Sequence, residues 1–145
     1  MINWVVRGVV LLWAALFLLT GFQGLTAAAP YFDLAGPLLD PTGRNTVRAD
    51  LSSFFLVSAV FAVIGVLRSG WTHALLVPAA LFGTALLGRL LGLVAFGDSI
   101  TAAITQAMIA EAISVALLLG AWWHLSRVGV VLAGNEAASG KNLPD

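Results

Sequence analysis

A long apolar stretch with one permanent charge constrains the fold of this chain more than any other feature. Residues 74–96 (ALLVPAALFGTALLGRLLGLVAF) contain a single charged side chain, Arg89. The stretch is long enough to cross a bilayer, which takes roughly 20 residues of helix. Because a guanidinium stays protonated in proteins, Arg89 in a spanning helix must reach an interface, water or a buried carboxylate. The next apolar stretch supplies such a carboxylate, Glu111.

The composition of the 145-residue chain predicts an integral membrane protein. The sequence is 60% hydrophobic and only 10% charged, whereas soluble domains contain about 25% charged residues. Its net charge is zero, so no polyanionic partner such as nucleic acid is implied. The partner that the hydrophobic composition implies is the lipid bilayer. With no cysteine, two histidines and one tyrosine, the chain has no thiolate ligands and few catalytic groups. We therefore expect no metal and no cofactor, and the sequence favours a role other than catalysis.

The apolar runs predict an all-α bundle of four antiparallel transmembrane helices. We place these helices at about residues 4–25, 50–68, 73–96 and 101–126. Short turns join the last three, as is usual for antiparallel neighbours. Together with an outer loop over residues 26–49, they form a membrane domain of residues 1–133. The polar, small-residue tail 134–145 is expected to be disordered.

The first apolar run has a second interpretation, a secretory signal. Arg7, the apolar stretch after it and the alanines at 27–29 resemble a signal with its cleavage site. Pro30 directly after the alanines argues against cleavage there, and the stretch exceeds the about 7–15 residues of a signal core. These features favour a retained helix.

The outer loop is expected to form a structured cap over one end of the bundle. It holds three of the five prolines and two turn-rich clusters, which interrupt helices. The next helix then begins near Asp50, whose carboxylate suits the positive end of a helix. Asn45 or Thr46 is the expected capping residue.

The basic residues predict the orientation. Four spans put both termini on one side, and that side has the larger set of basic residues: Arg7, Arg68, Arg127 and Lys141, against Arg44 and Arg48. The positive-inside rule then predicts a multi-pass protein of the bacterial inner membrane with both termini in the cytoplasm. An aromatic belt is expected at the same end, formed by Trp71, Trp122 and Trp123 beside His73 and His124. Two facing imidazoles could also ligate haem or a metal, but the tryptophans favour an interfacial role.

Four charged residues form a predicted network. At about 1.5 Å of rise per residue, Arg89 lies about 10 Å and Glu111 about 15 Å below the outer helix ends, so the two can meet. Asp50, with Arg48 beside it, lies roughly 10 Å above Arg89. Whether Arg89 pairs with Glu111 or with Asp50 is open at this point. So are three roles for the charges: a lock between helices, a functional polar site, or outward snorkelling of Arg89.

Small residues flank Arg89. Gly88 and Gly92 form a small-xxx-small pattern, which lets the backbone of a neighbouring helix approach. Pro78 is expected to bend the inner end of the same helix.

Two short motifs carry a family resemblance. Arg48-Ala49-Asp50 enters the second helix, and Gly88-Arg89-Leu90-Leu91-Gly92 is followed by Gly97-Asp98. In these motifs the chain, apart from its tail, resembles an uncharacterised bacterial family of four-helix membrane proteins, a domain of unknown function. Its layout is similar to that of DoxX-like membrane proteins. The first family brings no catalytic residues. The DoxX likeness implies association with redox or quinone enzymes, as an analogy of layout.

Three classes of function are compatible with the sequence. The leading one is a structural or accessory subunit that contacts other membrane subunits, or further copies of itself, through faces rich in Gly, Ala and Phe. The second is a binding or transport module for a proton, an anion or a small polar molecule at Arg89 and Glu111. The third is a quinone- or redox-associated subunit, with the quinone beside Trp13 or Trp122. The first leads because no nucleophile–base pair can be built from these residues.

Overall fold

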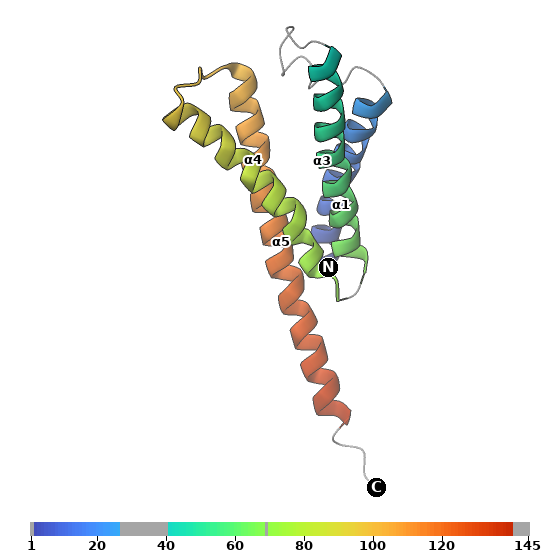
Figure 1. Ribbon diagram of the computed structural model, residues 1–145. Coiled ribbons are helices and arrows are strands. Elements are labelled where there is room, and N and C mark those ends of the chain that lie inside the picture. The colour runs from blue at the N-terminus through green and yellow to red at the C-terminus, as the bar shows by residue number, and fades with distance from the viewer. Residues whose placement is uncertain (1, 27–40, 69, 141–145) are drawn as a thin grey trace.

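The computed structural model describes residues 2–26, 41–68 and 70–140, and within these ranges the side chains of residues 41, 44 and 128–140 are left out of the description. The elements are α1 (Ile2–Thr26), α3 (Pro41–Leu67), the short 3₁₀ helix η1 (Thr72–Leu75), α4 (Leu76–Ala95) and α5 (Ala102–Gly140) (Figure 1). Four helical segments in these ranges are long and apolar enough to cross a membrane: Ile2–Thr26, Asn45–Leu67, Thr72–Ala95 and Ala102–Arg127. The predicted fold class, a helical membrane bundle, is confirmed.

The four helices form two antiparallel pairs. α1 packs mainly on α3, and α4 packs mainly on α5. Figure 1 shows that the pairs meet near the start of α1 and diverge toward the end where α4 turns into α5. Only 17–33% of each spanning segment is therefore buried inside the chain. The remaining helix surface is open to lipid or to other helices.

An aromatic cluster fills the junction between the two pairs. The ring of Phe82 on α4 lies 5.4 Å from Trp13, 4.9 Å from Phe17 and 4.8 Å from Phe54, measured between centroids. Trp13 Nε1 also donates a 3.0 Å hydrogen bond to Ser114 Oγ, which ties α1 to α5 inside the core. The buried residues that pack around this cluster are small or aliphatic: Val10, Ala14, Ala59, Ala62, Val66, Leu75, Ala79, Leu118, Ala121 and Leu125.

Two glycines allow the closest helix contacts. A Cβ on Gly21 of α1 would lie 2.8 Å from Leu56 Cγ on α3. A Cβ on Gly65 of α3 would lie 2.7 Å from Leu75 Cγ on η1. Both glycines are buried, so the chain comes this close only because no side chain stands there.

The second spanning helix begins earlier than predicted. α3 starts at Pro41 and not near Asp50, because proline suits the first helical position, where its fixed φ is preorganised and its missing N–H has no partner anyway. Asp50 therefore lies in the body of α3. Thr46 Oγ1 donates a 3.0 Å bond to the carbonyl of Thr42 in the preceding turn, so Thr46 is not a capping residue. Residues 27–40, most of the predicted outer loop, lie outside the described residues.

The last helix continues beyond its predicted end. α5 runs to Gly140, through the first part of the tail that we expected to be disordered from residue 134. The polar composition that suggested disorder also contains Glu136, Ala137 and Ala138, which are strong helix formers. Residues 141–145 lie outside the described residues.

Candidate functional site

The central polar contact joins α4 to α5. Arg89 Nε donates a 2.8 Å hydrogen bond to Glu111 Oε1, and the two side chains form an ion pair. The Glu111 side chain is only 8% exposed, whereas that of Arg89 is 38% exposed. The carboxylate is thus inside the protein, and the guanidinium connects it to the surface.

Glu111 is only half satisfied. Its second oxygen, Oε2, is buried and has no hydrogen-bond partner in the described part of the chain. Ser114, one turn along α5, does not supply one, because its hydroxyl donates a 2.7 Å bond to the carbonyl of Ala110. A buried charged oxygen without a partner is costly. Oε2 is therefore an acceptor available to a proton, a water molecule or a ligand.

Arg89 also lines a cleft beneath the turn between α4 and α5. The cleft has a volume of about 360 Å³ and is lined by Ala85, Gly88, Arg89, Leu93, Asp98 and Ile104. A guanidinium has five N–H donors, and the one on Nε is used by Glu111. Among the described residues, no hydrogen bond occupies the four N–H groups on the two Nη atoms. The cleft therefore contains an oriented cation with free donors.

A carboxylate enters the same cleft from the turn. Gly97 has a φ of 71°, a left-handed conformation that glycine adopts without strain. The N–H of Asp98 then donates a 3.1 Å bond to the carbonyl of Gly92. The Asp98 carboxylate lies so close over Gly92 that a Cβ there would overlap it. Arg89 and Asp98 share the cleft but form no ion pair with each other, as far as the described residues show.

The other two charges of the predicted network lie elsewhere. Arg48 and Asp50 are exposed on α3, and neither is an ion-pair partner of Arg89 or Glu111 in the described structure. α3 belongs to the other helix pair, whose outer end diverges from α4 (Figure 1). The structure therefore brings together Arg89 and Glu111, and it leaves Arg48 and Asp50 outside the site. Asp98 is the carboxylate that sequence reasoning did not assign to it.

Gly88 and Gly92 do not mediate the helix contact predicted for them. A Cβ on Gly88 would have no neighbour within 4 Å, and one on Gly92 would meet the Asp98 side chain. Gly88 instead lines the cleft, and Gly92 makes room for the Asp98 carboxylate. A small-residue pattern shows where another segment can approach a helix closely, but it does not show whether that segment is a second helix or a turn.

The two histidines contact different neighbours. His124 Nε2 lies 2.8 Å from Asn3 Oδ1, and the His73 ring lies 6.2 Å from that of Trp122. Among the described residues, no three His, Cys, Asp or Glu side chains gather around a possible metal. Trp13 is buried, and its indole N–H is already donated to Ser114, which leaves that group unavailable to a quinone.

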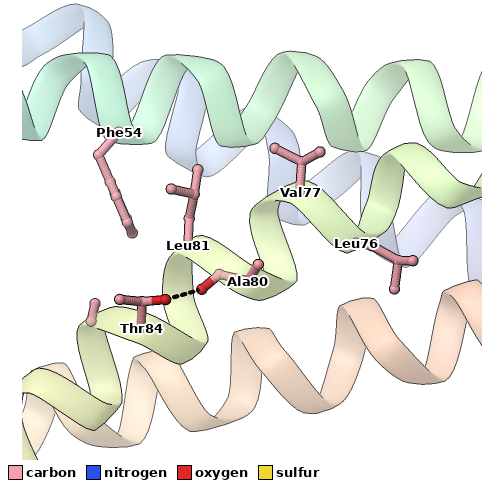
Figure 2. A pocket seen from close by; sticks show the side chains of 7 residues that line it. Phe54, Leu76, Val77, Ala80, Leu81 and Thr84 are labelled. Atoms are coloured by element: carbon pink, nitrogen blue, oxygen red, sulfur yellow. Dashed lines mark hydrogen bonds between the residues drawn. The ribbon is translucent and has the colours of Figure 1, made fainter.

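A second, largely apolar groove runs between α3 and α4. It has a volume of about 670 Å³ and is lined by Phe54, Leu76, Val77, Ala80, Leu81, Thr84 and Ala85. Figure 2 shows Phe54 extending from α3 toward the α4 residues. The hydroxyl of Thr84, the only polar side-chain group in the lining, donates a 2.8 Å bond to the carbonyl of Ala80. The groove therefore offers packing and no unpaired side-chain polar group.

Comparison of the chain with protein-family models, with curated proteins and with solved structures gives no match. The resemblance to DoxX-like proteins therefore stays a prediction carried by short motifs.

Proposed function

We propose that the protein is an accessory subunit that binds a transmembrane helix of a partner membrane protein in the groove between α3 and α4. The observation that carries this proposal is the groove itself, a largely apolar groove lined by Phe54 of α3 and six residues of α4 (Figure 2). No element among the described residues fills it. Its apolar walls suit a lipid-facing helix, which would pack there without leaving a polar group unpaired.

The face of α4 in this groove suits a helix better than it suits lipid chains. Ala80 and Thr84 line the groove at four-residue spacing, and both are exposed. Such small-xxx-small faces let two backbones approach closely, so that packing favours helix over lipid. The Thr84 hydroxyl already donates a hydrogen bond within its own helix, so this face offers no free hydroxyl donor to a polar ligand.

The proposal is tested by photo-crosslinking in native membranes. A photoreactive amino acid replaces Leu81 in the groove, and adducts are identified by mass spectrometry. We expect one dominant adduct, formed with a transmembrane helix of another protein. Ala80→Leu fills the groove and should remove the adduct. Ala116→Leu is the matched control, because Ala116 lies in a second exposed small-residue stripe on α5 with Ala112 and Gly120.

Three results would overturn this assignment. An adduct that persists in Ala80→Leu would place the partner elsewhere, and loss in Ala116→Leu alone would move the interface to α5. An adduct with a second copy of this chain would replace the accessory role with a homodimer.

A second candidate function, binding or transport at Arg89 and Glu111, is favoured by one observation, the unpartnered Oε2 of Glu111. Such an oxygen can take up a proton or accept a bond from a small polar ligand. Proton flux into proteoliposomes, driven by a pH difference, tests this role. We expect Glu111→Gln to abolish the flux and Asp50→Asn, an exposed carboxylate on α3, to leave it intact. Equal flux in empty and protein-containing vesicles would eliminate transport of protons.

A further inference from the structure

We infer that the cleft beneath the α4–α5 turn binds the phosphoethanolamine headgroup of a phosphatidylethanolamine lipid, with the phosphate on Arg89 and the ammonium on Asp98. This inference does not depend on the helix-binding groove, because the two sites share only Ala85 in their linings.

The free N–H donors of Arg89 can bind an anionic oxygen group. The bond from Nε to Glu111 fixes the plane of the guanidinium and leaves the Nη groups for a ligand. Phosphate oxygens match this donor geometry, and guanidinium–phosphate pairs are often bidentate. Because the Arg89 side chain is 38% exposed, a ligand can reach it from the membrane side of the protein.

The carboxylate of Asp98 selects a zwitterion over an anion. Arg89, Glu111 and Asp98 together carry one excess negative charge, so an anionic headgroup would face repulsion from Asp98. A ligand that also carries an ammonium adds no net charge and gives Asp98 a cationic partner, which it lacks among the described residues. A primary ammonium offers hydrogen-bond donors to the carboxylate, whereas the quaternary ammonium of choline has none.

The depths of the two charges match the order of groups in this lipid. Asp98 lies in the turn after α4 ends at Ala95, at the membrane surface. Its carboxylate reaches back over Gly92, and Arg89 lies three residues deeper along the helix, about 4.5 Å at about 1.5 Å per residue. In phosphatidylethanolamine the phosphate lies nearer the acyl chains and the ammonium nearer water. The chains can then descend along the apolar walls formed by Ala85, Leu93 and Ile104.

The size and shape of the cleft are suitable. Its volume of about 360 Å³ lies at the lower end of the range of about 300–1,000 Å³ for small-molecule sites. Gly88 leaves its floor open, and the missing side chain of Gly92 lets the Asp98 carboxylate lie across α4. A side chain at either glycine would alter the cleft without removing a charge.

Native mass spectrometry of the purified protein tests the inference. The protein is supplied in turn with phosphatidylethanolamine, phosphatidylcholine, phosphatidylglycerol and soluble glycerophosphoethanolamine. We expect retention of phosphatidylethanolamine to exceed that of phosphatidylcholine by about five-fold, the ratio that one hydrogen bond from the primary ammonium to the carboxylate produces. Asp98→Asn and Gly88→Leu should remove the preference, and Asp50→Asn should keep it. Circular dichroism checks that every variant retains the helicity of the parent.

Several outcomes would overturn the inference. Equal retention of the two zwitterionic lipids by the parent protein would eliminate recognition of the ammonium. A preference for phosphatidylglycerol would show that Asp98 does not select the ligand. Persistence of the preference in both Asp98→Asn and Gly88→Leu would place the lipid outside the cleft. Competition by glycerophosphoethanolamine at the same concentration as the lipid would overturn the lipid source and assign the cleft to a soluble ligand.

Discussion

The two side chains of the central ion pair differ in how much water reaches them. Arg89 is 38% exposed and Glu111 is 8% exposed. If the partner is removed, Arg89 can turn outward to the headgroups on its long aliphatic stem. Glu111 has no such freedom, because its short side chain is enclosed and one of its oxygens already lacks a partner. Removing one partner therefore does not have the same effect as removing the other.

This difference predicts an ordered series of stabilities. We expect Arg89→Leu to lower the free energy of unfolding by about 3 kcal/mol, the low end of the range for broken buried pairs. Glu111→Gln should lower it less, and Arg89→Leu combined with Glu111→Leu should recover most of the loss. Thermal unfolding in detergent measures the series, with Asp50→Asn as the exposed control. If Arg89→Leu leaves the unfolding temperature unchanged, the pair is not a lock between α4 and α5.

The Trp13–Ser114 hydrogen bond, 3.0 Å long, is a buried polar contact between α1 and α5. Ser114→Ala leaves the buried indole N–H without an acceptor, which should cost about 1–3 kcal/mol. Ser53→Ala, on an exposed position of α3, is the matched control and should change little. Chemical unfolding of both variants in detergent checks this. An equal change in the two would mean that the bond contributes nothing measurable between α1 and α5.

At the scale of elements, the α1–α3 pair depends on one backbone approach. A Cβ on Gly21 would lie 2.8 Å from Leu56 Cγ and 3.1 Å from the Leu56 backbone nitrogen. The side chain can turn away, but the backbone atom can move only with α3. We therefore expect Gly21→Ala to destabilise the protein by about 1–3 kcal/mol through overpacking.

The control for this prediction is Gly8→Ala on the same helix, where a Cβ would have no neighbour within 4 Å. That change should leave stability unchanged or raise it by about 0.5–1 kcal/mol, since alanine is the better helix former. Thermal unfolding of the two variants side by side decides the matter. Stabilisation by both changes would mean that α1 and α3 can separate slightly without loss.

The existence of the spanning helices could be predicted from the sequence, but their ends could not. Apolar length locates a membrane segment regardless of its neighbours. Pro41 is compatible with either a turn or the first position of a helix, and the polar residues after it gave no apolar signal. The continuation of α5 through a small, polar segment to Gly140 was missed for the same reason.

For the candidate site too, some residues could be predicted from the sequence and others could not. Arg89 and Glu111 lie on helices joined by a short turn, so counting residues from that turn puts their side chains at compatible heights. The same counting wrongly placed Asp50 near Arg89. The separation of α3 from α4 depends on how the two helix pairs meet around Phe82 and Trp13, which residue counting does not include. Asp98 needed the left-handed turn at Gly97. Gly21 and Gly65, which make the close contacts, have no local pattern that distinguishes them from Gly88 and Gly92.

At the scale of the whole molecule, arginines stack on tryptophans at one end of the bundle. Three such stacks among the described residues come from different segments of the chain, with guanidinium-to-ring distances of 5.9, 4.6 and 4.0 Å: Arg7 on Trp4, Arg68 on Trp71, and Arg127 on Trp123. Tryptophan concentrates at membrane interfaces, and basic residues concentrate on the cytoplasmic side. The stacks therefore indicate an interface at this end and favour a cytoplasmic location for it.

This orientation predicts opposite labelling of two positions. The chain has no cysteine, so a thiol reagent can label only the single cysteine that is introduced. Ser99 is exposed in the α4–α5 turn, and His73 is exposed in η1 at the opposite end of α4. A membrane-impermeant thiol reagent should label Ser99→Cys in intact cells and His73→Cys only after permeabilisation. The reverse pattern would place the arginine–tryptophan end outside.

The outcome also fixes the position of the long last helix. α5 continues beyond Arg127, where its spanning segment ends, to Gly140. At 1.5 Å per residue this extension is about 20 Å long, and Figure 1 shows it projecting past the other helices. With the predicted orientation it reaches into the cytoplasm, whereas the cleft formed by Arg89 and Asp98 faces the outer leaflet. Ser139→Cys should therefore behave like His73→Cys and be labelled only after permeabilisation, unlike Ser99→Cys, which should be labelled in intact cells. Labelling of Ser139→Cys from outside would contradict the orientation even if one of the other two positions were inaccessible.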